Sequence, residues 1–217
     1  MNAGRPIVFV VDDDPSFLRA AGRMLRAAGH AVETFESAPD LLARLAEGPA
    51  GCVVADLRMP GMGGLELQEA LAGGGNPLPV VFLTGHGDVP TTVRALKHGA
   101  EDFLTKRAPK EDLLGAVERA LAREGRERAE RTRRTGDRDL YDRLTPRERQ
   151  VLAHVVRGRL NKEIAWDLSI HERTVKFHRT SITSKLGIAS VAGLTRWVQE
   201  AGLQAELDAA LEAFPKG

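Results

Sequence analysis

Short apolar runs and longer amphipathic stretches alternate along the first half of the chain. The runs are three to five residues long and rich in valine, leucine and phenylalanine, which is typical of buried strands. We expect strands over residues 7–11, 31–35, 51–55, 79–83 and 102–104. Apolar residues recur at helical spacing over 15–28, 37–45, 64–71, 89–98 and 110–122. Five such repeats predict an α/β fold with one parallel sheet and helices on both faces.

The last third of the chain has apolar residues at helical spacing only, which predicts an all-α module of four helices. Thr145 and Glu148 mark the start of the first helix, because together they form a capping box. Asn161 is a candidate cap for the second helix. We expect the first helix to begin near residue 146 and the second near residue 161. The third and fourth helices are expected to span 172–186 and 190–201.

The apolar positions of this module predict which side chains face its core. The residues expected to point inward from the third helix are Val175, Ile182 and Leu186. We also expect Trp166 to belong to the core rather than to a binding surface. Leu207 and Leu211 have helical spacing in the tail, but the sequence assigns that segment no role.

Residues 123–138 lose the apolar stripe and alternate in charge. Two interpretations are open: a solvated linker, which we favour, or an extension of the preceding helix through ion pairs worth about 0.2–0.5 kcal/mol each. The chain therefore divides into an α/β domain over 5–122, a charged linker over 123–140 and a helical domain over 141–204.

Charge is unevenly distributed although the formal net charge is only +1. Residues 1–109 carry 10 Lys and Arg against 13 Asp and Glu, whereas residues 141–217 carry 12 against 9. This asymmetry suggests two modules with different partners. A single cysteine, Cys52, excludes an internal disulfide framework. The apolar run over 7–11 is too short for a signal segment or a membrane span, so we expect a cytoplasmic protein without a membrane partner.

Carboxylates, a hydroxyl and an ammonium follow the predicted strands. The residues at these strand ends are Asp12, Asp13, Asp14, Asp56, Thr84 and Lys106. In a doubly wound sheet the carboxyl ends of the central strands lie side by side. Clustered carboxylates require a cation, and oxygen ligands with open positions suit Mg²⁺. The hydroxyl and the ammonium suit the oxygens of a transferred phosphoryl group. Helix capping by the three successive aspartates is the simpler alternative.

The segments VVDDDP, VADLRMPGMGG, VVFLTGHGD and GAEDFLTK resemble the receiver domain of two-component response regulators, over about residues 5–122. The resemblance implies a flavodoxin-like, five-stranded parallel (βα)5 domain with strand order 2-1-3-4-5. It implies that Asp56 accepts a phosphoryl group from a sensor histidine kinase. The remaining roles that it implies are Mg²⁺ binding by Asp12, Asp13, Asp56 and the Arg58 backbone carbonyl, switching by Thr84 and Phe103, and phosphate binding by Lys106.

The segments LTPRERQVL, NKEIAWDL and RTVKFHRTSITSKLG resemble the LuxR-type helix-turn-helix output domain of NarL-like and FixJ-like regulators, over about residues 141–201. Residues 159–185 hold six Lys and Arg against three Asp and Glu, which suits contact with a DNA major groove. The resemblance implies DNA contact by Lys176, Phe177 and Thr180, with support from Lys162, Thr174, His178 and Lys185. Whether Phe177 meets a thymine methyl or packs on the second helix is open.

We therefore expect a transcription regulator that is not an enzyme. Phosphorylation of Asp56 would draw Thr84 and Lys106 inward and promote homodimerisation and binding to double-stranded promoter DNA. An aspartate-dependent phosphatase is disfavoured, because it would need a carboxylate where Arg58 stands. A flavodoxin-like nucleotide-binding protein is disfavoured because the chain has no GxGxxG turn or P-loop.

One position departs from the family pattern. Receivers usually have proline after the phosphate-binding lysine, with a cis bond between the two, but here Arg107 follows Lys106. A cis bond before a residue other than proline costs about 2.5–4 kcal/mol, so we expect a trans bond. We also expect that change to leave Lys106 less firmly held over Asp56.

Overall fold

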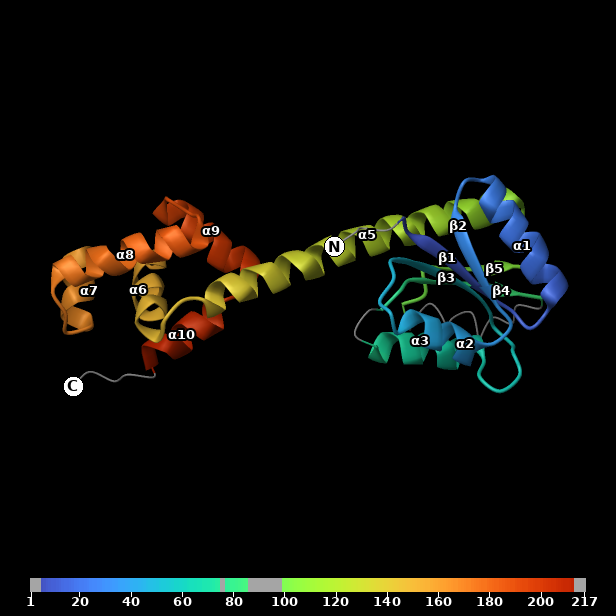
Figure 1. The fold of residues 1–217 in the computed structure, drawn as a ribbon, viewed down its shortest axis with the longest axis horizontal. Coiled ribbons are helices and arrows are strands. Elements are labelled where there is room, and N and C mark those ends of the chain that lie inside the picture. The colour runs from blue at the N-terminus through green and yellow to red at the C-terminus, as the bar shows by residue number, and fades with distance from the viewer. Residues whose placement is uncertain (1–4, 75–76, 86–98, 213–217) are drawn as a thin grey trace. The chain divides into compact units, whose positions relative to one another are not determined.

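The computed structural model of the chain describes residues 5–74, 77–85 and 99–212. The chain forms two compact units, Met1–Ala129 and Glu130–Gly217, which are described separately below. The helix expected over 89–98 lies outside the described residues. Figure 1 shows a sheet covered by helices in the first unit and helices in the second.

The first unit is built on a five-stranded parallel sheet with the order β2-β1-β3-β4-β5. Its strands are β1 Ile7–Val11, β2 Ala31–Phe35, β3 Gly51–Asp56, β4 Val80–Thr84 and β5 Asp102–Thr105. The predicted α/β fold and strand order are therefore confirmed. In the register of β1 and β3, Val11 pairs with Ala55, so Asp12 and Asp56 follow at the same edge of the sheet.

Helices cover both faces of this sheet (Figure 1). One face packs on α1, Pro15–Ala27, and on the first part of α5, Lys110–Asp142, through residues that include Val10, Leu25 and Val117. The other face packs on α2, Ala38–Leu45, and α3, Gly64–Gly73, around Phe9 and Phe82. Alternate residues of each strand supply the two faces, which explains why the central strands β1, β3 and β4 are apolar along almost their whole length.

Helix α5 continues through the charged stretch to Asp142, so the helical extension is found rather than the favoured solvated linker. Ion pairs between residues one turn apart support the helix. Arg123 Nε lies 2.7 Å from Glu127 Oε1, and Arg134 Nε lies 2.9 Å from Glu130 Oε1. Such exposed pairs are individually weak. Apolar burial at the far end adds to them, because Tyr141 is 2% exposed in the core of the second unit.

The second unit contains the end of α5 and five further helices within the described residues. They are α6 Pro146–Val156, α7 Asn161–Asp167, α8 Glu172–Leu186, α9 Val191–Ala201 and α10 Gln204–Glu212. The capping box of Thr145 and Glu148 starts α6, as predicted. Asn161 is the first residue of α7 rather than its cap, and its side-chain oxygen accepts a hydrogen bond from Arg179 at 3.1 Å.

The core of this unit confirms most of the predicted inward positions. The residues of α8 that are buried in it are Val175, Ile182 and Leu186. Leu207 is fully buried in the same core, so α10 completes a core to which the sequence had not assigned it. The prediction for Trp166 is wrong, because 82% of this residue is exposed. Ile164 and Ala165 already fill the inward face of the short helix α7, and the next position points outward.

No helix in the described ranges, which omit 1–4, 75–76, 86–98 and 213–217, combines the length and the apolar character that crossing a membrane requires.

Candidate functional site

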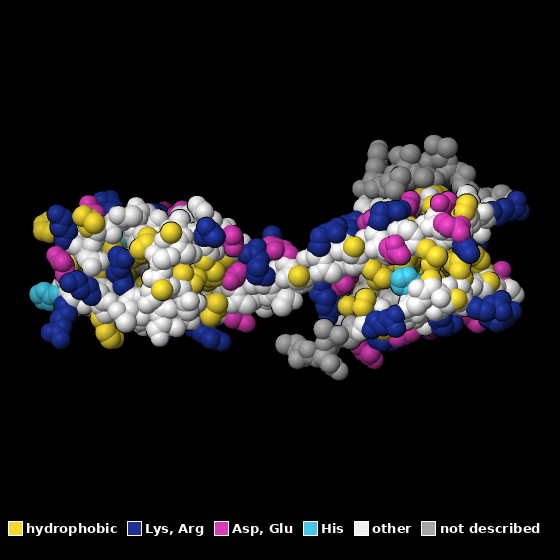
Figure 2. Space-filling view, turned by 90° about the horizontal axis from the view of Figure 1, so that it is seen from above, with side chains coloured by type: hydrophobic (Ala, Val, Ile, Leu, Met, Phe, Trp, Pro, Cys, Tyr) yellow, Lys and Arg dark blue, Asp and Glu magenta, His cyan; other side chains and the backbone are white. Residues whose placement is uncertain are grey.

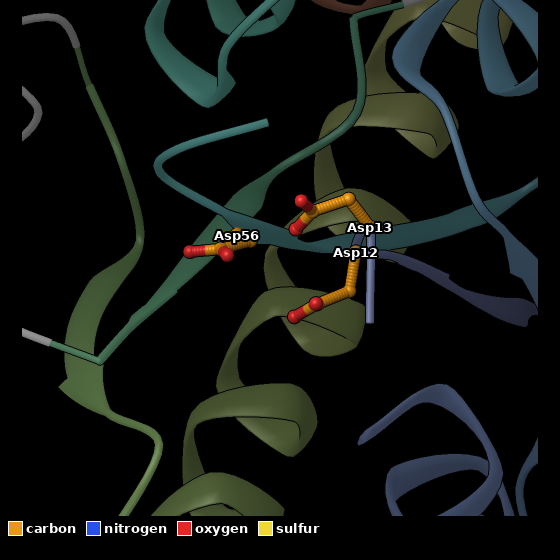
Figure 3. Close-up of side chains that lie close together, drawn as sticks. All are labelled: Asp12, Asp13 and Asp56. Carbon is orange, nitrogen blue, oxygen red and sulfur yellow. The ribbon is translucent and has the colours of Figure 1, made fainter. Parts of the chain in front are cut away.

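Three carboxylates meet at the carboxyl edge of the sheet. Asp12 and Asp13 follow β1 and Asp56 ends β3, and Figure 3 shows the three side chains at this edge. One oxygen from each lies within 4.8 Å of the others. Asp12 is 1% exposed and Asp56 is 8% exposed, whereas Asp13 faces solvent. The structure thus brings together the carboxylates that the sequence predicted.

Helix capping accounts for only one of the three successive aspartates. The Asp14 carboxylate accepts a hydrogen bond from the Ser16 backbone N–H at 2.8 Å and so caps α1. The Asp12 carboxylate accepts one from the Asp14 N–H at 3.0 Å, which fixes its direction. Asp12 and Asp13 are therefore available for the cluster, and the simpler capping explanation does not cover them.

Lys106 lies between two of these carboxylates. Its Nζ is 2.6 Å from Asp12 Oδ2 and 2.9 Å from Asp56 Oδ2. The bond from Lys106 to Arg107 is trans, as expected, since no described peptide bond is cis. The expectation that Lys106 is less firmly held than in a receiver with a Lys-Pro bond stays a prediction. The Lys106 backbone N–H donates to the Thr84 carbonyl at 2.8 Å, so pairing with the end of β4 helps to position this residue.

Burial and charge set the protonation behaviour of this cluster. Burial raises the pKa of Asp12, and hydrogen bonds from Lys106 and Asp14 offset this only in part. For Lys106, burial alone would lower the pKa, but hydrogen bonds to Asp12 and Asp56 outweigh it and raise the pKa. Three ionised carboxylates and one ammonium leave two negative charges uncompensated. Oxygen ligands with this charge suit a small divalent cation such as Mg²⁺.

The loop after Asp56 holds the end of β3 tightly. The Arg58 backbone N–H donates to Asp56 Oδ1 at 3.4 Å, so the Arg58 backbone lies beside the cluster. The Gly64 N–H donates to the Leu57 carbonyl at 3.0 Å. A Cβ atom at Gly64 would lie 2.5 Å from the Asp56 carbonyl oxygen, so only glycine allows α3 to start this close to the strand.

The two predicted switch residues lie on neighbouring strands. Thr84 ends β4 and is 1% exposed. Phe103 on β5 is partly exposed, and its ring centroid lies 6.3 Å from that of Phe82 on β4. Phe103 pairs with Phe82 in the register of the two strands. Thr84 and Phe103 therefore lie on directly paired strands, with Thr105 opposite Thr84.

The second unit presents most of the predicted DNA-contact residues on its surface. Lys176, Phe177 and Thr180 are exposed on α8, and Phe177 is 69% exposed. That exposure excludes the alternative in which the Phe177 ring packs on the second helix. The predicted supporting residues that are exposed or partly exposed are Lys162, Thr174 and His178. Figure 2 shows dark-blue Lys and Arg side chains beside yellow apolar ones on this unit.

Lys185 differs from the other predicted DNA contacts. Its Nζ lies 2.6 Å from Glu148 Oε2 and donates to the Arg143 carbonyl at 3.2 Å. Glu148 is 4% exposed and also accepts hydrogen bonds from the Thr145 N–H at 2.7 Å and the Ser181 hydroxyl at 2.6 Å. Burial alone would raise the pKa of Glu148, but these hydrogen bonds outweigh it and lower the pKa to about 2. Lys185 therefore stabilises the fold.

Two residues near these sites were missed from the sequence. The exposed Trp166 borders a groove of about 720 Å³ beside Lys162 and His171. Phe17 lies against Lys106, with its ring centroid 4.7 Å from Nζ. A signal for Phe17 existed, since it stands in the first turn of the helix that follows the aspartates.

Comparison with known families settles what these two units are. Residues 8–118 match the model of the response regulator receiver domain, and residues 142–198 match that of the luxR family of bacterial regulatory proteins. The chain belongs to the NarL/FixJ-type response regulators. This regulator is 40% identical to the response regulator protein TodT of Pseudomonas putida, over 88% of the chain and 84% of the relative. It is 38% identical to the transcriptional regulatory protein FixJ of Azorhizobium caulinodans, over 93% of the chain and 96% of that relative.

Solved structures agree with the family. The response regulator StyR shares 45% identity with this regulator and has a TM-score of 0.86, with 91% of this chain and 100% of that chain covered. The prediction of a phosphorylation-controlled transcription regulator with a receiver and a LuxR-type DNA-binding domain is thereby confirmed.

Proposed function

We propose that Asp56 of this regulator accepts the phosphoryl group of a phosphohistidine in a sensor histidine kinase. A carboxylate oxygen of Asp56 forms the new bond to phosphorus, while the bond from phosphorus to the histidine nitrogen breaks. The observation that supports this role is the place of Asp56, which is nearly buried within ion-pair distance of Lys106 and beside two further carboxylates. Lys106 then pairs with the transferred phosphoryl oxygens.

We infer that Asp12, Asp13 and Asp56 bind Mg²⁺ together with the Arg58 backbone carbonyl. The fit rests on the two uncompensated negative charges and on the oxygen atoms within 4.8 Å of one another. A bound Mg²⁺ ion would neutralise charge on the phosphoryl oxygens. Lys106 now lies against Asp12 and Asp56, so it competes with the cation for both carboxylates.

Phosphorylation is proposed to act on the output through the receiver surface. Thr84 and Phe103 lie on paired strands, so a shift of the threonine toward the phosphoryl group would be followed by the aromatic ring. The surface expected to form a homodimer involves β5, α5 and the segment over 89–98, which lies outside the described residues. Two output domains in a dimer would span two DNA half-sites. The protein is expected to act in the cytoplasm.

On the output domain, we propose that Lys176, Phe177 and Thr180 contact base edges in the major groove of promoter DNA. The support is their shared exposure on α8. Phosphate contacts are assigned to Lys162, Thr174 and His178. Lys185 is left out of this set because its ammonium is bound to Glu148.

The test of the phosphoacceptor is the variant Asp56→Asn. The full chain is incubated with acetyl phosphate and Mg²⁺, and its intact mass and oligomeric state are measured. The unaltered chain is expected to gain one phosphoryl group and dimerise, whereas Asp56→Asn gains none. Asp14→Asn is the matched control, because asparagine also caps helices and should leave phosphorylation unchanged. Equal phosphorylation or phosphate-dependent dimerisation of Asp56→Asn would overturn the assignment.

Lys176→Ala is expected to weaken DNA binding without unfolding the domain, since the side chain is exposed on α8. Loss of a base contact would cost about 1–3 kcal/mol and relax specificity at one position. Loss of a phosphate contact would weaken binding to all sequences and lower the salt slope by about one. The measurement is a salt titration of binding to selected and scrambled promoter DNA. Unchanged affinity for both would remove Lys176 from the interface.

A further inference from the structure

The ammonium of Lys106 has an aromatic neighbour in addition to its two carboxylates. The Phe17 ring centroid lies 4.7 Å from Nζ, within the range of a cation–π contact. Phe17 belongs to the first turn of α1, directly after the Asp14 cap. The Lys106 side chain is only 20% exposed, so this contact is largely shielded from water. Shielding strengthens a cation–π contact relative to one on an open surface.

The same ring lines a small apolar cavity beside the cluster. This cavity of about 180 Å³ lies between α1 and the start of α5, and Phe17, Met24 and Lys106 are among the residues that line it. The lysine stem therefore lies along apolar side chains and offers its ammonium to the carboxylates. In this setting an aromatic ring adds an attraction that uses none of the carboxylate oxygens.

We propose that Phe17 is a positioning residue for phosphoryl transfer, which it promotes by holding the Lys106 ammonium beside Asp56. The inference rests on the proposed role of Asp56 as the phosphoacceptor. A divalent cation would bind the oxygens of Asp12 and Asp56 that now contact Lys106, and the ammonium would lose those contacts. The Phe17 ring then keeps the ammonium in place until it contacts the phosphoryl oxygens.

This role predicts opposite effects on two measured quantities. In Phe17→Leu the apolar volume is largely retained but the aromatic face is lost. Phosphorylation by acetyl phosphate at saturating Mg²⁺ should slow by about three- to tenfold, the range for a partly shielded cation–π contact. The affinity for Mg²⁺, measured by calorimetry without phosphodonor, should rise by about two- to threefold, because a less firmly held lysine competes less for Asp12 and Asp56. Simple damage to the site would lower both quantities.

Matched variants separate the ring from its surroundings. Phe17→Tyr keeps an aromatic face and should restore the rate of the unaltered chain. Met24→Ala enlarges the same cavity two turns along α1 and should leave both quantities unchanged. If Phe17 acts through Lys106, Phe17→Leu should cause no further loss of rate in a Lys106→Ala background.

The outcomes distinguish this inference from the proposed function. Failure of the unaltered chain to become phosphorylated at Asp56 would overturn the phosphoacceptor assignment, and the role of Phe17 with it. Normal phosphorylation of the unaltered chain, combined with an unchanged rate in Phe17→Leu, would overturn the Phe17 inference alone. A parallel loss of rate and Mg²⁺ affinity in Phe17→Leu, or an additive loss in the Lys106→Ala background, would do the same.

Discussion

Glu148→Ala is expected to destabilise the output domain by about 2–4 kcal/mol, because it removes the carboxylate partner of the partly buried Lys185 ammonium and the acceptor of two further donors. In the native protein the carboxylate lies within 2.6 Å of Lys185 Nζ and accepts hydrogen bonds from Thr145 and Ser181 at 2.7 Å and 2.6 Å. These partners connect the start of α6 to the end of α8. Hydrogen exchange of α6 amides in the full chain measures the loss locally.

The same carboxylate predicts how this stability depends on pH. The pKa of Glu148 falls from its ordinary value of 4.5 to about 2 in the folded protein. The folded state therefore binds the proton less well than the unfolded state, and the contribution, about 3 kcal/mol, is present above about pH 4.5. It is lost as the pH falls from there toward 2. In Glu148→Gln this part of the acid sensitivity should disappear.

Glu163 provides a matched control for Glu148. It accepts a hydrogen bond from the Leu160 N–H at 2.7 Å at the start of α7, much as Glu148 does from Thr145 at the start of α6. Its side chain is 39% exposed, however, and its partner Arg159 lies 3.7 Å away. Glu163→Ala should therefore cost about 0.5–1 kcal/mol. Equal losses in the two variants would contradict the special role of the buried carboxylate.

A fragment of residues 130–217 is expected to fold and to bind DNA without phosphorylation, whereas a fragment of 143–217 should be less stable by about 3–5 kcal/mol. The reason is that the end of α5 belongs to the core of the output domain. Tyr141 is 2% exposed there, and Trp197 Nε1 donates to Asp137 Oδ1 at 2.7 Å. Arg138 Nη1 of α5 also lies 2.6 Å from Glu206 Oε1 of α10. Thermal unfolding followed by circular dichroism compares the two fragments.

Point variants in the longer fragment test this explanation. Asp137→Ala should cost about 1–2 kcal/mol, because it leaves the largely buried Trp197 N–H without its acceptor. Asp139→Ala is the control on the exposed side of the same helix and should be close to neutral. Equal melting temperatures for the fragments beginning at 130 and 143 would show that the end of α5 is dispensable. A folded 130–217 fragment that does not bind promoter DNA would contradict the expectation that the output domain binds DNA without phosphorylation.

The sheet was predictable because its central strands β1, β3 and β4 are buried on both faces and form apolar runs in the sequence, as in Gly51–Asp56. The course of α5 was not, because the charged stretch has no apolar stripe and its burial occurs at single positions. Glu124 and Tyr141 are such positions, and sequence spacing alone does not identify them. Trp166 was misplaced for the opposite reason: an aromatic residue in a short amphipathic helix usually faces the core, but Ile164 and Ala165 already fill that face.

The carboxylate cluster was predictable because the carboxyl ends of parallel strands lie at the same edge of the sheet. Asp12, Asp56 and Lys106 meet there as expected. Contacts set by side-chain direction between separate elements were not visible in the sequence. The pairing of Lys185 with Glu148 joins positions 37 residues apart, and that of Lys106 with Phe17 joins α1 to the end of β5. Such pairs depend on how helices pack, which spacing within one helix does not specify.

The contrasting environments of the two tryptophans give this regulator a built-in pair of optical reporters. Both belong to the output unit, so intrinsic tryptophan emission excited selectively carries no direct signal from the receiver. Trp166 is 82% exposed and open to a collisional quencher such as iodide, whereas Trp197 is 9% exposed and bonded to α5. The quenchable fraction of the emission therefore reports on the surface beside the start of α8. The protected fraction reports on whether α5 stays docked on α9.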